Sequence, residues 1–302
     1  MRECHRTNAD KAGEPGDRPS SEGNTAMTMV EREALVNDWV AWRVRRVDEL
    51  REPYGWLSLS ALHWLTGEPT GYRGVPGRWD GRPAGVMARV TPEDGLVLHG
   101  RHVQGTVLVE VADAAPPAIA TVADKRIEIM QRGRRYAIRV RDPRAATRTR
   151  FAGVPAYAPR PEWIVEGWFH AYDEPRDVTL GSVVDGLTHR QCARGVVRFH
   201  LDGEDYALTA FGRADGGLWL PFRDATSGVT TCPAARSLTV PEPGPDGLLI
   251  LDFNRAVNPP CAFTDFATCA LPPPENTLPF AVEAGERSPL RVAPDGGRHR
   301  AE

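Results

Sequence analysis

RYAIRVRD, residues 135–142, is the stretch that decides the fold, because apolar and charged side chains alternate along it. Tyr136, Ile138 and Val140 fall on one face of an extended chain, and the residues between them fall on the other. Such alternation is typical of a strand with one buried face. Since no helical segments separate the runs of this kind, the sequence predicts a mainly β protein, an antiparallel β-barrel or sandwich. Similar short runs bounded by Gly, Pro and Asp occur at 96–98, 106–111, 127–130, 164–168, 178–184, 195–201, 206–211, 218–222 and 248–253.

One helix is predicted before the strands, over residues 30–52. Val36, Val40 and Val44 recur four positions apart, which places an apolar stripe on an otherwise charged helix. Pro53 then ends the helix, because proline lacks the backbone donor that a continuing helix needs. The fold is therefore expected to carry a single N-terminal helix.

The C-terminal part of the chain, residues 254–279, is too rich in proline to form a central strand. Pro259, Pro260 and the run 272–274 remove backbone donors and hold the preceding residues in extended conformations. We expect an irregular but well-fixed segment that wraps across the sheet. Its apolar anchors are Phe263, Phe266 and Leu271.

The two ends of the chain have little to bury. Residues 1–29 and 291–302 are polar, charged and rich in Gly and Pro, and such segments cannot offset the entropy lost on ordering. We expect both to be disordered tails that flank a single β-rich domain over residues 30–290. Met1, Met27 and Met29 are alternative start positions.

Composition excludes several classes of partner. A net charge of −3 and a pI of about 6.3 give no basic surface for nucleic acid. No apolar stretch approaches the roughly 20 residues that span a bilayer, and no signal-peptide pattern is present. Five cysteines, without CxxC or zinc-finger spacing, fit free thiols in a reducing compartment. The sequence predicts a cytoplasmic protein without nucleic-acid or membrane partners, and it leaves the oligomeric state open.

The common catalytic signatures are missing. The chain has no GxSxG elbow, no GxxxxGKS/T phosphate loop, no GxGxxG after a strand and no HExxH zinc motif. No cofactor, metal or reaction type follows from the sequence, and the question whether the protein is an enzyme stays open.

The run FRDATSGVTTCPAAR, residues 222–236, follows a predicted strand and is dense in short polar side chains. One interpretation is a turn in which Asp, Thr and Ser side chains bond their own backbone. The other is a pocket mouth in which the planar fork of Arg236 binds a carboxylate or phosphate. Asp224 is then the candidate base. The candidate ligand-binding residues of this pocket are Thr226, Ser227, Thr231, Arg236, Asn254 and Asn258.

Two further arginines, Arg132 and Arg139, are candidate ligands of an anion. On a strand, Arg139 shares a face with Arg135 and Arg141. This face is either a solvated outer surface with Asp142 as a partner or, if it lines a barrel interior, an anion-binding wall. We favour the second role for Arg132 and Arg139 only.

Cys261 and Cys269 lie in the proline-rich segment. Buried, inert thiols are the commonest form of cysteine in a reducing compartment. A reactive thiol needs a neighbouring base, cation or helix N-terminus that lowers its pKa. A metal site at the two thiols would need histidines from elsewhere in the chain. Cys261 is the candidate nucleophile if the chemistry is covalent.

Five motifs, taken together, resemble those of one bacterial family. They are WLSLSALHWLTGE (56–68), RRYAIRVRD (134–142), FAGVPAY (151–157), FRDATSGVTT (222–231) and DFNRAVNPPCAFTDFATCALPPPEN (252–276). Their order and spacing are similar to those of domain of unknown function 1684, over about residues 34–287. Trp56 belongs to the first motif, and the resemblance adds it to the candidate ligand-binding residues.

The resemblance implies no reaction, because the family has none assigned. Relatives commonly carry Tyr, Gly, Tyr and Pro at four positions where this chain has Cys232, Ala235, Val257 and Ala270. If the two Tyr hydroxyls bind a ligand in the relatives, their loss implies a changed ligand or a weakened activity in this chain.

Two functions fit these observations. In the first, the protein binds a small molecule, with or without transforming it, in a β-barrel-like cavity lined by the polar cluster. In the second, it is a non-enzymatic ligand carrier or a structural module, and the same motifs only fix the C-terminal segment against the sheet. The two differ in whether Asp224, Arg236 and Asn258 face a cavity or face one another, and in the reactivity of the thiols.

Overall fold

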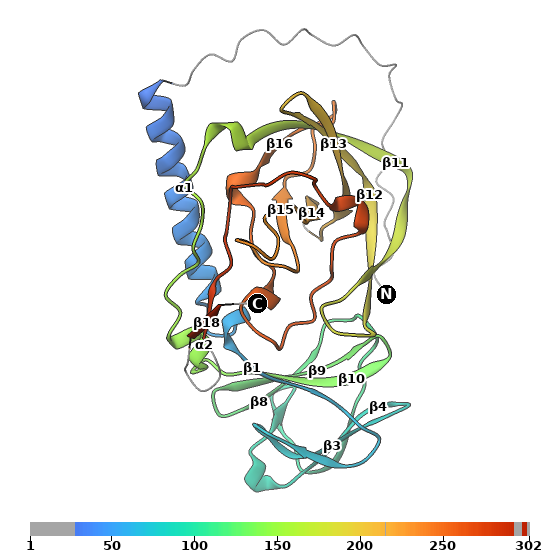
Figure 1. The fold of residues 1–302 in the computed structure, drawn as a ribbon. Helices are drawn as coiled ribbons and strands as arrows, with labels where there is room; N and C mark the ends of the chain where they lie inside the picture. Colours follow the sequence, from blue (N-terminus) through green and yellow to red (C-terminus); the bar gives the residue numbers. More distant parts are fainter. Residues whose placement is uncertain (1–27, 215, 293–297, 301–302) are drawn as a thin grey trace.

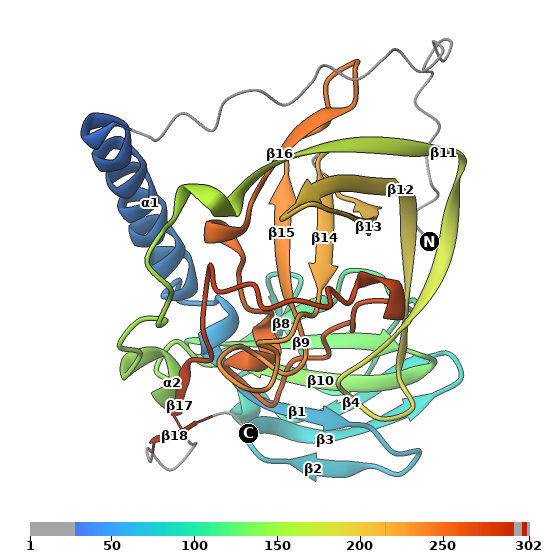
Figure 2. The ribbon, with the colours of Figure 1, turned by 45° about the horizontal axis from the view of Figure 1, so that its top comes forward.

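Antiparallel strands are the main regular structure of the protein, in two groups that follow one another along the chain (Figures 1 and 2). The computed structural model describes residues 28–214, 216–292 and 298–300, so most of the two predicted tails lies outside the described residues. The mainly β fold with one long N-terminal helix is confirmed. At the other end, β17 (Leu290–Val292) pairs with β18 (Arg298–Arg300).

Two sheets face one another in the first group and enclose an apolar core. Trp79 is fully buried there, and its indole N–H donates to the carbonyl of Pro76 at 2.6 Å. Ile138 and Val140 enter the same core, as the alternation in residues 135–142 predicts. One sheet has the order β1 (Leu59–Trp64), β10 (Arg135–Arg141), β9 (Lys125–Arg132), β8 (Ala118–Val122), β5 (Val97–Leu98), β6 (Arg101–His102), and the other has the order β2 (Thr70–Tyr72), β3 (Val75–Arg82), β4 (Gly85–Val90), β7 (Gly105–Val109).

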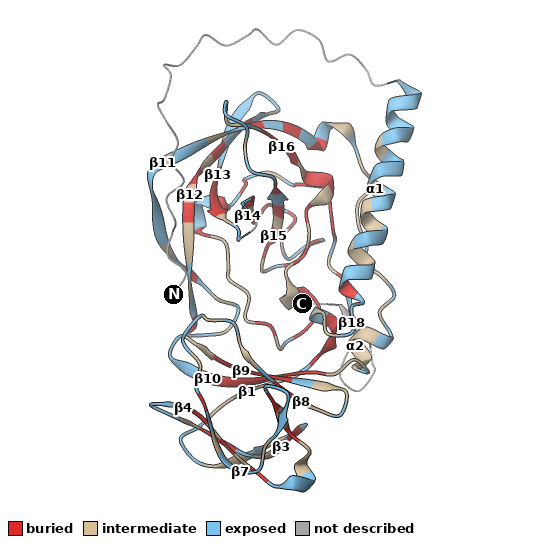
Figure 3. Ribbon diagram, turned by 180° about the vertical axis from the view of Figure 1, so that it is seen from behind, coloured by how far each residue is buried: buried red, intermediate tan, exposed pale blue. Residues whose placement is uncertain are grey.

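Strands β9 and β10 are buried on both faces, not only on the face that the sandwich core covers (Figures 1 and 3). Ala137, Arg139 and Arg141 point away from the sandwich core and are nevertheless buried. The second group of strands and the C-terminal segment lie on that side of the sheet in Figure 1. The prediction of a solvated outer face with Asp142 as partner is therefore wrong for Arg141, and Arg139, for which that role was not favoured, is buried as well.

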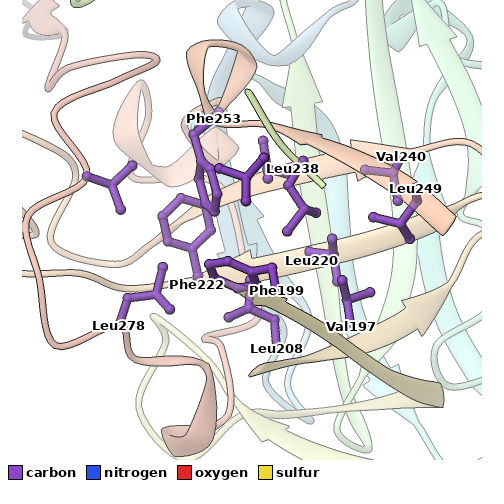
Figure 4. Close-up of a cluster of buried hydrophobic side chains, with 14 of the residues drawn as sticks. Val197, Phe199, Leu208, Leu220, Phe222, Leu238, Val240, Leu249, Phe253 and Leu278 are labelled. Atoms are coloured by element: carbon purple, nitrogen blue, oxygen red, sulfur yellow. The ribbon is translucent and has the colours of Figure 1, made fainter. Parts of the chain in front are cut away.

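The second group is one curled sheet whose concave face is filled with apolar side chains. Figure 4 shows part of this core, in which Phe222 and Phe253 meet with ring centroids 5.6 Å apart. The predicted strands 164–168 and 178–184 are parts of a single long strand, β11. The order of the sheet is β15 (Arg236–Val240), β14 (Leu218–Phe222), β13 (Glu204–Gly212), β12 (Thr188–Leu201), β11 (Ile164–Gly181), β16 (Leu248–Asp252).

The chain after β16 forms the predicted irregular wrapping segment, residues 253–288, which crosses the curled sheet (Figure 2). Asn276 ties it to two strands: its side-chain amide donates to the carbonyls of Thr209 at 2.9 Å and Pro221 at 2.8 Å and accepts from the amide of Thr209 at 2.7 Å. Asn276 is fully buried, so the segment is fixed by its polar atoms as well as by its prolines. It contains the short helices η4 (Phe253–Arg255), η5 (Pro260–Ala262) and η6 (Pro274–Asn276).

The helix α1 (Met29–Leu50) begins at a capping box formed by Thr28 and Glu31. It lies along the edge of the second group (Figure 3) and attaches through polar and aromatic side chains. The indole of Trp39 donates to the carbonyl of Asn254 at 3.0 Å, and Arg46 pairs with the buried Glu286 at 3.1 Å. Among the described residues, no helix is both long enough and apolar enough to cross a membrane.

The apolar stripe that predicted this helix does not face the protein. Val36, Val40 and Val44 have exposed fractions of 38%, 46% and 55%. The stripe identified the helix correctly, because its period is helical, but an amphipathic stripe normally marks the buried face. Here the anchoring contacts are made by other side chains of the helix, among them Trp39 and Arg46, so these three valines are left on the surface.

Replacing Asn276 by Asp should destabilise the fold by about 3 kcal/mol or more, because a carboxylate would then face two carbonyl oxygens in a buried site. Urea unfolding followed by tryptophan fluorescence measures the change. The exposed helix residue Asn37, replaced in the same way, serves as the control and should change the stability by less than about 0.5 kcal/mol. Equal unfolding midpoints for the two variants would contradict this account of the segment.

Candidate functional site

The predicted polar cluster lies at the open end of the hairpin formed by β14 and β15. Phe222 ends β14 and pairs with Arg236, the first residue of β15, so the loop between them begins and ends at one place. Asp224 and Arg236 meet there in an ion pair of 2.7 Å, and both side chains have an exposed fraction of 0%. The sequence therefore identified two residues that do lie together.

Most of the remaining polar atoms of this pair are bonded inside the protein. The second carboxylate oxygen of Asp224 accepts from the amide and the hydroxyl of Thr226, at 2.7 and 2.5 Å, and from the amide of Val282 at 3.3 Å. Arg236 donates to the carbonyls of Val282 at 2.8 Å and of Ala284. The Thr226 hydroxyl contacts that of Thr231 at 2.8 Å, and Ser227 accepts from the Asp224 amide at 3.1 Å. The loop is thus a clamp on residues 282–284 of the wrapping segment.

The two predicted asparagines are used in the same way. Asn254 exchanges hydrogen bonds with the backbone of Arg160, donating to its carbonyl and accepting from its amide, both at 2.9 Å. Asn258 donates its side-chain amide to the carbonyl of Arg287 at 2.8 Å, and its backbone amide donates to the Glu286 carboxylate at 2.7 Å. Two buried atoms of this cluster, Nε of Arg236 and Oδ1 of Asn258, have no protein partner. These contacts match the structural interpretation of the motifs.

The space that a barrel-like cavity would need is occupied. The concave face of the curled sheet holds the aromatic core of Figure 4, which includes Phe199, Phe222 and Phe253. Two depressions, of about 420 and 490 Å³, are open to the surface elsewhere. One is lined by Arg43 of α1, Arg150, residues 152–155 and Leu290, and the other by residues 65–67, 81–83, 131 and 134–136. Neither is lined by a residue of the polar cluster.

Replacing Asp224 by Asn should cost about 3–5 kcal/mol of stability, since it leaves the buried Arg236 charge without its partner. The same replacement at Asp177, which forms an exposed ion pair with Arg190, is the matched control and should cost no more than about 1 kcal/mol. Urea unfolding of both variants gives the comparison. A destabilised D177N beside an unaffected D224N would contradict the clamp.

A second cluster, the three thiols of Cys232, Cys261 and Cys269, lies where the wrapping segment meets the loop after β14. All three are free, Cys232 is buried, and the other two are half-buried. The backbone amide of Cys261 contacts the sulfur of Cys269 at 3.3 Å. The thiols of Cys232 and Cys269 both influence the pKa of Cys261. Among the described residues, no group of three or more His, Cys, Asp or Glu is arranged to hold a metal ion.

The three thiols differ in acidity. Its bond to Cys261 and then burial raise the pKa of Cys232. For Cys261, the contact with Cys232 lowers the pKa, but the bond to Cys269 and burial outweigh it and raise the pKa to about 12. The bond from the Cys261 thiol lowers the pKa of Cys269 against the effect of burial, and the Cys261 amide and the Arg139 charge lower it further. Cys269 is therefore the most acidic thiol of the cluster.

Arg139 belongs to the buried outer face of the β9–β10 hairpin. Glu128 bridges Arg139 at 2.5 Å and Arg141 at 2.6 Å, and both guanidinium groups lie near the ring of Trp56, at 5.5 and 5.2 Å from its centroid. Burial lowers the pKa of Arg139 and the negative charge of Glu128 opposes this, and an arginine stays charged across the range in which a thiol titrates. Trp56 itself is 38% exposed, so this part of the cluster reaches the surface.

The end of the β11–β12 hairpin completes the surroundings of Cys269. Nε2 of His189 contacts the Ser182 hydroxyl at 3.2 Å, and this hydroxyl donates to the carbonyl of Cys269 at 3.3 Å. Burial and the nearby charge of Arg132 lower the pKa of His189, while a bond to the Thr268 backbone raises it. Arg132 donates to two backbone carbonyls, at 2.7 and 3.0 Å. Arg132 and Arg139 thus lie on this side of the molecule, apart from the Asp224 cluster with which they were predicted to share a ligand.

Sequence reasoning missed Glu128, Ser182 and His189, and it chose Cys261 over Cys269. A sequence signal for Glu128 exists, because Gly133 lies between two predicted strands. In the structure Gly133 and Arg134 have positive φ, of 56° and 65°, as a two-residue hairpin turn requires. Taking these two residues as the turn would have set Glu128 opposite Arg139, which is the observed register. No sequence signal places Ser182, His189 and Cys269 side by side, since they are brought together only by the path of the wrapping segment.

The lowered pKa of His189 makes stability depend on pH. As the pH falls through about 6.5, the unfolded chain binds a proton at this residue that the folded chain does not, so the folded state loses stability. Replacing His189 by Gln should reduce the loss of stability between pH 7 and 5, measured as unfolding midpoints in urea. The same change at the exposed His170 is the control. An unchanged pH dependence in H189Q would refute the assignment.

Comparison with known proteins identifies a family but no activity. Residues 149–287 match the model of the family described as Protein of unknown function (DUF1684), which includes the clamp and all three thiols but neither Trp56 nor Arg139. No curated protein matches the chain. Among solved structures, the chain is similar to an uncharacterized protein of Haloarcula marismortui determined by solution NMR, with 34% sequence identity and a TM-score of 0.40. That match covers 46% of this chain and 78% of the other.

Proposed function

We propose that this chain, which belongs to the family described as Protein of unknown function (DUF1684), binds a small electrophilic molecule beside its three clustered thiols. In this proposal the Cys269 thiolate attacks the bound molecule. The observation that carries it is the contact of the Cys269 sulfur with the Cys261 amide, among three free thiols from two loops, and the charge of Arg139 acts on the same sulfur. A thiolate is the nucleophilic form of cysteine, and a neighbouring cation favours that form.

Cys269 is a better nucleophile than Cys261, the residue that the sequence favoured. Cys261 gives a hydrogen bond to Cys269 from its amide and contacts it through its thiol, so Cys261 serves as the donor and Cys269 as the acceptor. Hydrogen-bond donors directed at a thiolate stabilise its negative charge, so no metal ion is needed for this. The half-buried position of Cys269 still leaves access for a small molecule.

The surroundings favour a ligand that carries or develops negative charge. The charge of Arg139 lowers the pKa of Cys269, and Arg132 is near enough to Arg139 for the two positive charges to act on one another. The partly exposed ring of Trp56 offers an apolar surface next to these charges. A mostly apolar surface with a few directed polar groups is the usual composition of a small-molecule site. Free thiols also fit a cytoplasmic protein whose partner is a small molecule and not a nucleic acid or a membrane.

The competing function is a carrier or structural module without chemistry. The clamp formed by Asp224 and Arg236 favours this reading for the polar motifs, because their polar atoms bind residues 282–284 and not an open pocket. It does not account for the donor that Cys261 directs at Cys269. Thiol reactivity in the folded protein separates the two functions.

Alkylation by iodoacetamide, read peptide by peptide in a mass spectrometer, tests the nucleophile. In the folded full-length chain, Cys269 should react faster than Cys232 and Cys261, and its rate should persist below pH 9, the ordinary pKa of a thiol. Replacing Cys261 by Ala removes a hydrogen bond to a charged group, worth about 1.5 kcal/mol, and should slow Cys269 about tenfold at pH 7. A Cys269 that reacts only after unfolding would sink the proposal.

Two arginine variants provide a matched control for this test. R139Q removes the cation beside Cys269 and should slow its alkylation at pH 7. R141Q breaks the other half of the same Glu128 bridge, and should leave the Cys269 rate close to wild type. Equal slowing in both variants would indicate a general loosening of the hairpin and not an effect of charge on the thiolate.

A further inference from the structure

We infer that the electrophile is a hydroperoxide and that Cys261 and Cys269 form a dithiol pair, which peroxide oxidises to a disulfide. This inference rests on the proposed function, because it takes the Cys269 sulfur as the attacking atom. It goes beyond that proposal by naming the class of substrate, the product and the role of Cys261.

The placement of the two thiols is what a resolving pair needs. Cys269 Sγ lies 3.3 Å from the backbone amide nitrogen of Cys261. A disulfide requires β-carbons about 3.5–4.5 Å apart, and a sulfur that already contacts the backbone of its partner residue needs little movement to reach that geometry. Both residues belong to the wrapping segment, and both are half-buried, so a small oxidant reaches them while the backbone around them stays fixed.

The backbone around the pair is held on each side. Cys261 lies in η5 between Pro260 and Ala262, and the chain just after Cys269 pairs with the end of β11, where the Leu271 amide donates to the carbonyl of Gly181 at 2.9 Å. The carbonyl of Cys269 itself accepts from the amide of Val183 at 3.0 Å and from the Ser182 hydroxyl. These bonds fix the peptide of Cys269 while its side chain stays free to turn toward Cys261.

The charges around the sulfur suit cleavage of an oxygen–oxygen bond. When a thiolate attacks a hydroperoxide, negative charge develops on the departing oxygen. The positive charge of Arg139 acts on Cys269, and its guanidinium, fixed by Glu128, can stabilise this charge at the moment it forms. The half-buried position also excludes bulky disulfide reagents more than it excludes a molecule of two oxygen atoms.

The atoms and electrons balance in two steps. The Cys269 thiolate attacks the terminal oxygen of ROOH, a sulfur–oxygen bond forms, the oxygen–oxygen bond breaks, and RO⁻ leaves and takes a proton to become ROH. The sulfenic acid on Cys269 is then attacked by Cys261: a sulfur–sulfur bond forms, the sulfur–oxygen bond breaks, and hydroxide leaves with the Cys261 proton as water. The pair loses two electrons and the hydroperoxide gains them. An external dithiol, which transfers two electrons back, would be needed for another cycle.

Hydrogen peroxide added to the reduced full-length chain tests the inference, with peptide mapping of disulfides under non-reducing conditions. A Cys261–Cys269 disulfide should form at a rate on the order of tenfold above that of a free model thiol at pH 7, which is only a few per cent ionised. In C261S the sulfenic acid should persist on Cys269 and be trapped by dimedone, and in C269S neither product should form. Wild-type mapping alone decides the matter if either variant fails to fold.

The outcomes separate this inference from the proposed function. Rapid alkylation of Cys269 without a Cys261–Cys269 disulfide would overturn the dithiol pair and leave the nucleophile in place. Failure of both reactions would overturn both proposals. Oxidation of Cys269 directly to sulfinic acid in the wild type, with Cys261 unchanged, would also contradict a resolving role for Cys261.

Discussion

The buried ion pair between Asp224 and Arg236 is the interaction on which the C-terminal half depends. Neither side chain touches solvent, and together they hold the backbone of Val282 and Ala284. Removing two charges from water is costly, and the cost is offset only when good geometry and further hydrogen bonds accompany the pair. The loop supplies those bonds through Thr226 and the segment's own backbone. The pair therefore selects one position for the wrapping segment among the many that apolar contacts alone would allow.

Other parts of the molecule follow from that position. Once residues 282–284 are fixed, Glu286 is buried beside them, where it accepts the Asn258 amide and pairs with Arg46 of α1. The helix is thus held by a carboxylate on the segment and not by its own apolar stripe. The same segment brings Cys261 and Cys269 to the loop that carries Cys232, and further along the chain it is held by Asn276 and then by the clamp.

The sheet of β9 and β10 contributes the second half of the candidate site. A strand whose two faces are both buried normally carries apolar residues on both, yet this hairpin places Glu128, Arg139 and Arg141 on its second face. Their mutual ion pairs make the charges tolerable in a site of low dielectric constant. Arg139 and Arg141 carry two positive charges there, and Glu128 supplies only one negative charge. A thiolate at Cys269 would supply a second negative charge. The charge balance of the hairpin and the ionisation of Cys269 are therefore linked.

By itself the sequence determined the strands, the helix and the wrapping segment, because period, proline content and turn residues act over a few neighbours. It also identified the polar cluster, since Asp224 and Arg236 flank one hairpin. Only the tertiary structure decided their role: the same short polar side chains could line a pocket or satisfy buried backbone, and the path of residues 282–286 settled their partners. Two other outcomes have the same explanation: the valines of α1 are exposed, and Cys269 rather than Cys261 accepts the hydrogen bond. Which face of a helix is covered, and which thiol accepts a hydrogen bond, depends on atoms that are distant in the sequence and meet only after folding.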